Sequence, residues 1–180
     1  MTFTKISSER LILEPLSKED AQAMLNYRSL PEVYKYQGWQ PENVDDAEKF
    51  ILKHNTMESG GWMQLAIRLR EDGKLIGDCG MHFIDDEFKQ IEIGFSLSPV
   101  FQGKGYATEA VSCLLDYIFT TLRSHRVYGS CDPDNLSSIK LMTRIGMRKE
   151  AHLKESIWFK GRWADDVICA ILDHEWQKRK

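Results

Sequence analysis

The sequence lacks the features that mark several large classes of protein. It has no C-x-x-C pair, so neither a zinc site nor a dithiol redox motif is indicated. No window approaches the ~20 apolar residues of a membrane span, and the first residues lack the apolar stretch of a signal peptide. We therefore expect a cytoplasmic protein without a membrane partner, in which four scattered cysteines are reduced thiols: Cys79, Cys113, Cys131 and Cys169.

An excess of charge of one sign is also missing. Lys and Arg number 24, Asp and Glu number 27, and the formal net charge is −3. This balance gives no general attraction for nucleic acid, so we expect no nucleic-acid partner. Hydrophobic residues make up 42% and charged residues 28% of the 180 residues, which is ordinary for a globular chain. The length suits one domain, which we place at residues 1–180.

The first sixty residues predict one strand and two helices. The strand, Arg10–Pro15, ends at a proline, and the helix after it ends at Pro31. Residues 34–41 show no clear period and predict a loop with one helical turn. A second amphipathic helix is expected to begin at Asp45 and to be closed by Gly60-Gly61.

Next comes a stretch in which the apolar period changes to two. Residues 62–69 and 74–83 predict two strands joined by Asp72-Gly73, a strong hairpin signal. A third strand of this meander is indicated by apolar residues that alternate with polar or small ones: Ile91, Ile93, Phe95 and Leu97.

The second half alternates helices and strands. Its clearest element is a helix over residues 105–122, where apolar side chains recur every 3.6 residues for about four turns. The order of elements predicts an α/β mixed (α+β) fold with a single central mixed, mostly antiparallel sheet of about seven strands and helices on both faces. The remaining elements are expected at residues 126–130 (strand), 134–145 (helix), 147–159 (strand) and 163–172 (strand).

A glycine-containing turn precedes the long helix. Unpaired N–H groups at a helix start point outward, and the helix dipole adds positive potential there. Gly103 and Gly105 carry no side chain that would keep a phosphate away, and Lys104 adds a mobile cation. A turn that merely starts the helix is the alternative. The predicted pyrophosphate cradle consists of Gln102, Gly103, Lys104, Gly105, Tyr106, Ala107 and Thr108.

Two other phosphate-binding motifs do not fit this turn. A Walker A loop needs a glycine five residues before Gly-Lys and a hydroxyl residue after it, but Ser98 and Gly105 stand at these places. The dinucleotide fingerprint needs glycine or alanine where Thr108 stands.

Gln102, Gly105 and Ala107 match the signature Gln/Arg-x-x-Gly-x-Gly/Ala of the GNAT superfamily of N-acetyltransferases. The sequence resembles this family in further places. The strand Glu92–Leu97 is similar to the family's fourth strand, and Asn135-x-x-Ser138 is similar to the start of a later helix. Spread over nearly the whole chain, the resemblance follows the branch that contains the ribosomal-protein N-terminal acetyltransferases.

The resemblance implies acetyl-CoA as co-substrate and direct transfer without a covalent intermediate. Backbone amides of residues 102–108 would hold the pyrophosphate, and the Asn135 side chain would bond the pantetheine arm or nearby backbone. The fourth and fifth strands of the family separate, and pantetheine lies between them. Backbone groups of Phe95, Ser96 and Leu97 would then pair with pantetheine and polarise the thioester carbonyl.

Amine attack on a thioester needs a group that accepts one proton. Glu92 alternates with Ile91 and Ile93, so it points to the opposite face of the sheet, and we predict that it accepts the proton directly or through water. The alternative is a solvated or ion-paired strand glutamate. A nucleophilic role for Cys79 or Cys131 would need a lowered thiol pKa.

For the leaving thiolate, the resemblance favours Ser138 as the hydrogen-bond donor. The alternative is that Ser137 or Ser138 only caps its helix. Other members of the superfamily use a tyrosine nearby in that helix, but this chain has Leu141-Met142 there. The histidines show no H-E-x-x-H spacing, so we expect no metal.

The acceptor is expected to be a primary amine. The leading interpretation is that this amine is a protein or peptide N-terminus. The competing interpretations are a small amine, such as a polyamine, an aminoglycoside or an amino acid, and a non-catalytic role in CoA sensing. A monomer and a homodimer are both compatible with the sequence. Six aromatic residues are candidates for the wall of a pocket that binds the acceptor: Tyr34, Tyr36, Trp39, Trp158, Phe159 and Trp163. The alternative is that these side chains pack in the core.

Overall fold

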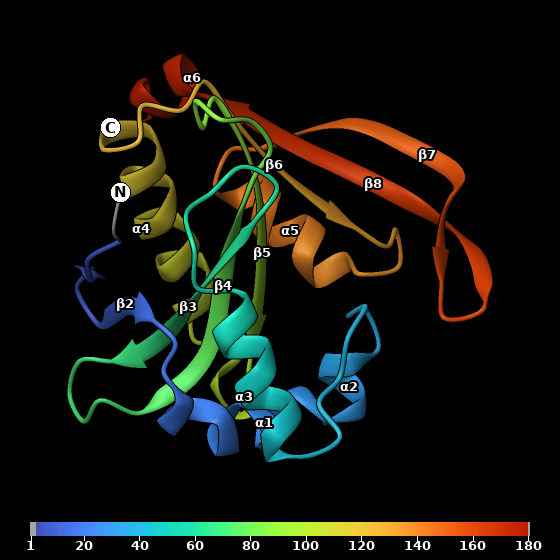
Figure 1. The fold of residues 1–180 in the computed structure, drawn as a ribbon. Coiled ribbons are helices and arrows are strands. Elements are labelled where there is room, and N and C mark those ends of the chain that lie inside the picture. The colour runs from blue at the N-terminus through green and yellow to red at the C-terminus, as the bar shows by residue number, and fades with distance from the viewer. Residues whose placement is uncertain (1–2, 180) are drawn as a thin grey trace.

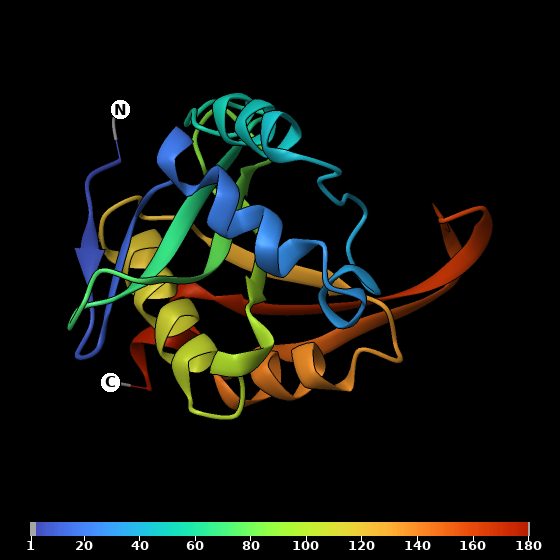
Figure 2. The ribbon, with the colours of Figure 1, turned by 90° about the horizontal axis from the view of Figure 1, so that it is seen from below.

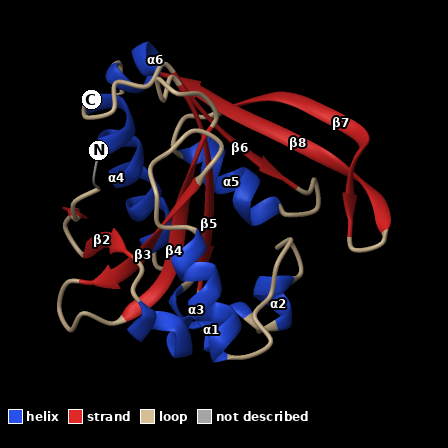
Figure 3. Ribbon diagram, viewed as in Figure 1, coloured by secondary structure: helices blue, strands red, loops and turns tan. Residues whose placement is uncertain are grey.

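One mixed sheet organises the protein, and the computed structural model describes residues 3–179 (Figures 1 and 3). Within these residues the sheet has eight strands in the order β1-β2-β3-β4-β5-β6-β8-β7. Neighbouring strands are antiparallel except β5 and β6, which are parallel. The mixed fold with a mostly antiparallel sheet is therefore confirmed. The strand beyond the predicted seven is β1, whose two residues, Ile6–Ser7, are too few to show a period.

The elements lie close to the ranges predicted from periodicity. After β1 the strands are β2 (Leu11–Pro15), β3 (Trp62–Leu69), β4 (Leu75–Phe83), β5 (Gln90–Leu97), β6 (Arg126–Cys131), β7 (Arg148–Phe159) and β8 (Arg162–Leu172). The helices are α1 (Ala21–Arg28), α2 (Pro31–Tyr34), α3 (Val44–Lys53), α4 (Tyr106–Thr120), α5 (Leu136–Arg144) and α6 (Asp173–Gln177).

Two helical layers enclose the sheet, with α1 and α3 on one face and α4 and α5 on the other (Figure 2). The apolar stripe of α4 packs on the sheet because its residues, including Leu114 and Ile118, are fully buried beside Ile91 and Ile93. On the opposite face, α1 and α3 form a smaller apolar cluster that is closed by Ala66 of β3.

The predicted end of α3 is wrong. The helix ends at Lys53, where the His54 amide donates to the Phe50 carbonyl over 3.1 Å. Gly60 and Gly61 instead pair with Phe83 at the end of β4. The seven residues between the end of the helix and Gly61 form a connecting segment. The amino-acid composition of this segment does not distinguish it from the last turns of a helix, which is why the helix was predicted to extend to the glycines.

Pro31 follows the end of α1 at Arg28 and is itself the start of another helix. It is the first residue of α2, a position that suits proline because its missing N–H would have no helical partner there. The helical turn predicted inside 34–41 therefore lies slightly earlier in the chain, at Pro31–Tyr34.

Strands β5 and β6 separate after a short paired stretch. Their register partners are Gln90 with Arg126, Ile91 with Val127 and Glu92 with Tyr128. Beyond Glu92 the β6-facing edge of β5 is unpaired as far as Leu97, although β4 still covers its other edge. This is the separation that the family resemblance implies.

The last hairpin, β7–β8, extends beyond the rest of the sheet and bends toward α2 (Figure 1). The bend coincides with irregular pairing between Leu153 and Ile157, where Glu155 has a positive φ of 46°. None of the helices in the part of the chain that the structure describes is long and apolar enough to cross a bilayer.

Candidate active site

A cavity of about 450 Å³ lies where β5 ends and α4 begins, between α2 and α5. This volume is in the range of small-molecule sites. Most of the residues predicted for the co-substrate and the leaving group line it: Phe95, Ser96, Leu97, Gln102, Gly103, Gly105, Tyr106, Ala107, Thr108, Asn135 and Ser138. Glu92 and Lys104 are not part of this lining.

The glycine turn has the backbone that the cradle prediction requires. Gly103 and Gly105 have positive φ angles of 74° and 83°, which side chains rarely adopt. No atom lies within 4 Å of the place where a Gly103 Cβ would stand, so the space is open. Gly105 precedes α4 and supplies no side-chain cap, which leaves the first amides of the helix for another acceptor.

Lys104 does not line the cavity. Its ammonium lies 5.4 Å from the centre of the Phe101 ring, and its carbonyl accepts a hydrogen bond from Arg10 over 3.1 Å. The guanidinium of Arg10 also covers the Tyr106 ring at 4.4 Å. Arg10 therefore holds the loop from the start of β2, a role that sequence spacing does not reveal.

Glu109, in the first turn of α4, completes this anchor. It accepts hydrogen bonds from the Ser8 hydroxyl over 2.7 Å and from Arg10 Nε over 2.6 Å. Burial by itself would raise the pKa of Glu109, but the bonds from Ser8 and Arg10 outweigh it and lower that pKa.

The free edge of β5 contains an unusual hydroxyl. Among residues 3–179, Ser96 Oγ is the buried side-chain polar atom without a hydrogen-bond partner, and Ser96 is only 6% exposed. Buried polar groups are almost always paired, so this one indicates a partner outside the chain. Beside it, the Gln102 side chain donates to the Leu97 carbonyl over 3.0 Å and ties the cradle to the end of the strand.

Asn135 and Ser138 meet at the start of α5. The Asn135 side chain caps the helix by accepting a hydrogen bond from the Ser138 amide over 3.2 Å. Asn135 thus bonds nearby backbone, one of the two roles considered for it. The alternative that Ser137 or Ser138 caps the helix is wrong. Both serines line the cavity, together with Leu141, which is buried.

Glu92 lies on the face of β5 opposite to Ile91 and Ile93, as alternation predicts. Its side chain is 24% exposed, and its Oε2 lies 3.1 Å from His82 Nδ1. The Tyr128 hydroxyl lies 3.5 Å from the same oxygen. Burial raises the pKa of Tyr128, and the Glu92 charge adds to the effect. The role of Glu92 as base remains a prediction.

His82 and Tyr128 were not predicted from the sequence to lie beside Glu92. Both are register partners of Glu92, on β4 and β6 respectively, so their side chains share its face. Neither lies near Glu92 in the sequence, and the spacing of the five histidines contains no signal for this pairing. Only alternation along β4, combined with the register, would have found His82.

A buried ionic cluster lies on the same face, below α1. Asp78 is fully buried and accepts hydrogen bonds from Arg28 Nε over 3.0 Å, from Tyr27 and from Gln64. Burial raises the pKa of Tyr27 well above its usual value, and the Asp78 charge raises it further. This cluster, also missed in the sequence, fixes α1 on β4 beside the cavity.

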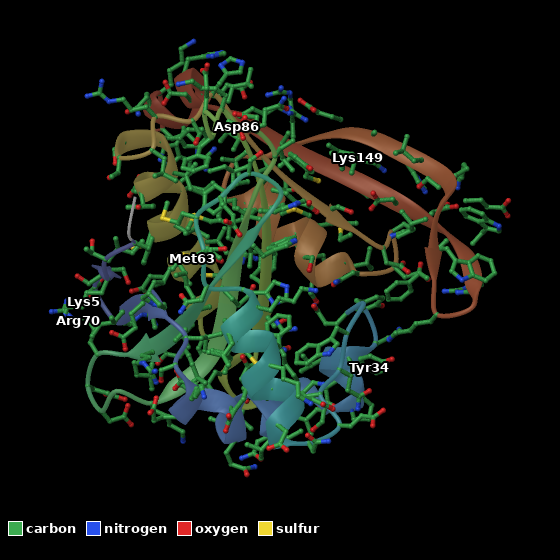
Figure 4. All side chains as sticks on the ribbon, in the orientation of Figure 1. Lys5, Tyr34, Met63, Arg70, Asp86 and Lys149 are labelled. Atoms are coloured by element: carbon green, nitrogen blue, oxygen red, sulfur yellow. The ribbon has the colours of Figure 1, made fainter. Side chains whose placement is uncertain are left out.

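The three candidate acceptor residues of the early segment lie in different environments. Tyr36 lines the cavity, and its hydroxyl donates to the Asp134 carbonyl over 3.0 Å. The tip of the β7–β8 hairpin contacts the end of α2, because Lys160 Nζ donates a hydrogen bond to the Tyr34 carbonyl over 2.7 Å. Tyr34 is labelled in Figure 4. Trp39 instead stacks on Phe50 of α3 at 4.2 Å, so core packing holds for Trp39.

Core packing is wrong for the two tryptophans of the hairpin. Trp158 and Trp163 are 63% and 59% exposed and form an edge-to-face pair at 5.5 Å. Exposed aromatic pairs of this size are typical of surfaces that bind a partner.

The cysteines have no sign of nucleophilic activation. Burial raises the pKa of Cys79 well above its usual value and raises the pKa of Cys131 to about 12. Both are therefore protonated thiols near neutral pH, whereas a nucleophile would need a lowered pKa.

Comparison with known proteins identifies the family of the chain. Residues 10–148 match the family described as acetyltransferase (GNAT) domain. The chain is similar to N-acetyltransferase p20 of Bacillus licheniformis, with 36% identity over 171 residues that cover 94% of this chain and 96% of that protein. It also resembles the crystal structure of a GNAT family acetyltransferase from Bacillus anthracis, with 31% identity, a TM-score of 0.86, and coverage of 96% and 100%.

The chain therefore belongs to the GNAT acetyltransferase family and is an N-acetyltransferase, which confirms the resemblance and sets the sensor interpretation aside. Its relatives differ in acceptor. The [ribosomal protein uS5]-alanine N-acetyltransferase of Escherichia coli is 32% identical over 107 residues, 59% of this chain and 55% of that protein. Spermidine N-acetyltransferase of Vibrio cholerae, solved with CoA and spermine, has 25% identity, a TM-score of 0.81, and coverage of 94% and 99%.

Proposed function

We propose that the protein, acting as one domain over residues 1–180, transfers an acetyl group from acetyl-CoA to the α-amine of a protein or peptide N-terminus in the cytoplasm. One observation carries the proposal. A single cavity joins the uncapped start of α4, the free edge of β5 with the unpaired Ser96 hydroxyl, and Ser138 on α5. The four cysteines are free thiols, which supports a reducing compartment.

The residues of the cavity fit acetyl-CoA. Gly103 leaves open space before the amides of α4, where a diphosphate would bind, and Gly105 adds no side-chain cap to them. The edge of β5 from Ile93 to Ser96, which β6 does not pair, offers N–H and C=O groups to the pantetheine amides, and Ser96 Oγ adds a donor. When bound there, acetyl-CoA supplies the thioester that an amine attacks.

Two side chains would handle the protons of the reaction. Glu92 accepts one proton from the attacking amine, directly or through a water, and His82 and Tyr128 orient its carboxylate. Ser138 donates a hydrogen bond to the thiolate that departs from the acetyl carbon. The backbone amides near Phe95 would stabilise the oxygen of the tetrahedral intermediate.

An α-amine suits this site better than a lysine side chain. Its pKa is near ~8, against ~10.4 for lysine, so a modest base is enough at neutral pH. The exposed Trp158–Trp163 pair stands on the hairpin whose tip contacts α2, next to the cavity, and offers a surface for a peptide chain. The similarity to the uS5-alanine enzyme supports the same acceptor class.

A small amine is the second candidate. A spermidine N(1)-acetyltransferase of Vibrio cholerae is 26% identical over 175 residues, 96% of this chain, and its name supports a polyamine acceptor. The cavity for acetyl-CoA would serve either acceptor, so the two candidates differ only at the acceptor side.

The test is a direct assay of the purified protein. Acetyl-CoA is mixed separately with pentapeptides that begin with alanine, serine or methionine, with butylamine and with spermidine. Release of CoA is followed with a thiol reagent, and the acetylated product is identified by mass spectrometry. We expect an acetylated peptide α-amine. Acetylation of spermidine with no peptide product would favour the second candidate, and absence of product with every amine would overturn the proposal.

A further inference from the structure

Four side chains on neighbouring strands form a line across the sheet, which we call the acceptor row: Trp62, His82, Glu92 and Tyr128. They come from β3, β4, β5 and β6, and each is the register partner of the next. The row ends at the last paired position of β5 and β6, where the gap between these strands begins. Its members therefore stand on one face, beside the place where the thioester is expected.

The Trp62 indole reaches from β3 toward β5 because two glycines make room for it. Gly80 and Gly94 are register partners on β4 and β5. A Cβ at Gly80 would stand 3.1 Å from Cε3 of the indole, and a Cβ at Gly94 would stand 3.7 Å from its outer carbons. The indole also lies parallel to the His82 ring, with centres 4.9 Å apart and 6° between the planes.

This arrangement places an aromatic wall next to a carboxylate. Glu92 is two residues from Gly94 on the same face, and thus about 7 Å along the strand. Trp62 and Glu92 are both partly exposed, so each offers surface to a bound group. A carboxylate beside an indole attracts an ammonium group, through charge and through the aromatic quadrupole.

Glu92 is also the more accessible carboxylate of this face, because its side chain is 24% exposed and its contacts with His82 and Tyr128 both fall on Oε2. Among the described residues, the other nearby carboxylates are buried: Asp78 is fully buried against Arg28, and Asp166 is 6% exposed and accepts a hydrogen bond from Ser130 over 2.7 Å.

The cavity rim carries charges of both signs. Glu32 and Lys140 line the cavity, and Lys35 on the same α2 segment interacts with the charge of Asp134. Lys160 approaches α2 from the hairpin. The rim therefore does not offer a second ammonium a surface of negative charge alone, because lysines stand on it as well as Glu32.

We propose that the acceptor row binds one ammonium group, between the Trp62 indole and the Glu92 carboxylate, and that Trp62 is a specificity-determining residue for monocationic acceptors. This inference rests on the proposed acetyltransferase function and restricts its substrate class. An α-amine at the end of a neutral or acidic peptide fits the site. A polyamine, with three or more separated charges, does not.

The first test replaces Trp62 by leucine and by phenylalanine. With the best peptide of the panel, Trp62→Leu should raise the KM about tenfold while the Kd of acetyl-CoA, measured by calorimetry, stays within about twofold. Trp62→Phe keeps an aromatic face and should recover most of the affinity. Trp176→Leu is the matched control, since Trp176 is a buried indole packed against Phe119, away from the row.

Different results would overturn the role of Trp62, the one-ammonium site and acetyl transfer itself. A Trp62→Leu protein that folds, binds acetyl-CoA and keeps the wild-type KM would overturn the role of Trp62. A wild-type kcat/KM for spermidine equal to or above that for the peptides would overturn the one-ammonium site, while acetyl transfer itself stands. If no amine of the panel is acetylated, the proposed function fails, and the inference fails with it.

Discussion

Arg10, just before β2, and Glu109, in the first turn of α4, are joined by two hydrogen bonds across 99 positions of sequence. The Arg10 amide donates to Oε1 over 2.7 Å, and Nε donates to Oε2 over 2.6 Å. Because Arg10 also bonds the Lys104 carbonyl, one side chain connects the sheet edge, the glycine loop and the helix that follows it. The cradle is thus held from outside its own segment.

This relationship predicts a pH-dependent stability. The pKa of Glu109 is lower in the folded protein than its ordinary value, so its stabilising effect is full above the ordinary carboxyl pKa and is lost as pH falls through the folded-state pKa. Glu109→Gln should lower the free energy of unfolding by about 1 kcal/mol at pH 7. Urea titrations should show this difference shrinking at acidic pH. Glu71→Gln, at an exposed turn position, is the control and should show no such change.

Replacement of Gly105 tests the cradle. A valine there would have a strained φ and a Cβ 3.3 Å from the Arg10 guanidinium that holds the loop, so it would displace the turn, and we expect Gly105→Val to weaken acetyl-CoA binding at least a hundredfold in calorimetry. Gly73→Val provides the same backbone strain, at φ 73° in the β3–β4 turn, away from the cavity. Equal affinity in the two variants would show that the glycine turn only starts a helix.

Variants of Ser138 and Asn135 should distinguish a role in catalysis from a role in capping α5. Ser138→Ala removes the hydroxyl but leaves the amide that Asn135 caps, so we expect kcat to fall about tenfold with the melting temperature nearly unchanged. Asn135→Ala removes the cap and should cost about 1 kcal/mol of stability. Steady-state kinetics and thermal unfolding of both proteins measure this. Normal kcat in Ser138→Ala would remove Ser138 from the reaction.

Glu92→Gln tests the proton acceptor. The amide cannot take a proton from the amine, so kcat should fall about a hundredfold or more while the Kd of acetyl-CoA is kept. Glu150→Gln is a matched control, because Glu150 is a strand glutamate bonded to Arg126 at 2.6 Å, outside the acceptor row. If both variants keep the wild-type kcat, Glu92 is a structural ion-pair residue.

The strands of the central meander could be predicted because their signal is local. Ile91 and Ile93 alternate with Glu92, and burial follows that alternation in the folded protein. The end of α3 could not be predicted in the same way, since Gly60 and Gly61 act through their pairing with Phe83, more than twenty residues away.

The candidate site also has one part that depends on local sequence and one part that depends on long-range pairing. The cradle depends on residues that are neighbours in sequence, with glycines at positive φ before a helix start, so Gly103 and Gly105 were accessible from spacing. His82 and Trp62 join Glu92 only through strand register, which depends on the packing of the whole sheet.

The sequence by itself determined the order of strands and helices, the glycine turn before α4 and the family, because periodicity and short motifs act over a few residues. Only the tertiary structure decided that β5 and β6 part after Glu92 and Tyr128, that Arg10 holds the turn, and that Trp62 stands near the free edge. These relationships join residues far apart in the chain, and their proximity exists only once the sheet has formed and the core has fixed its register.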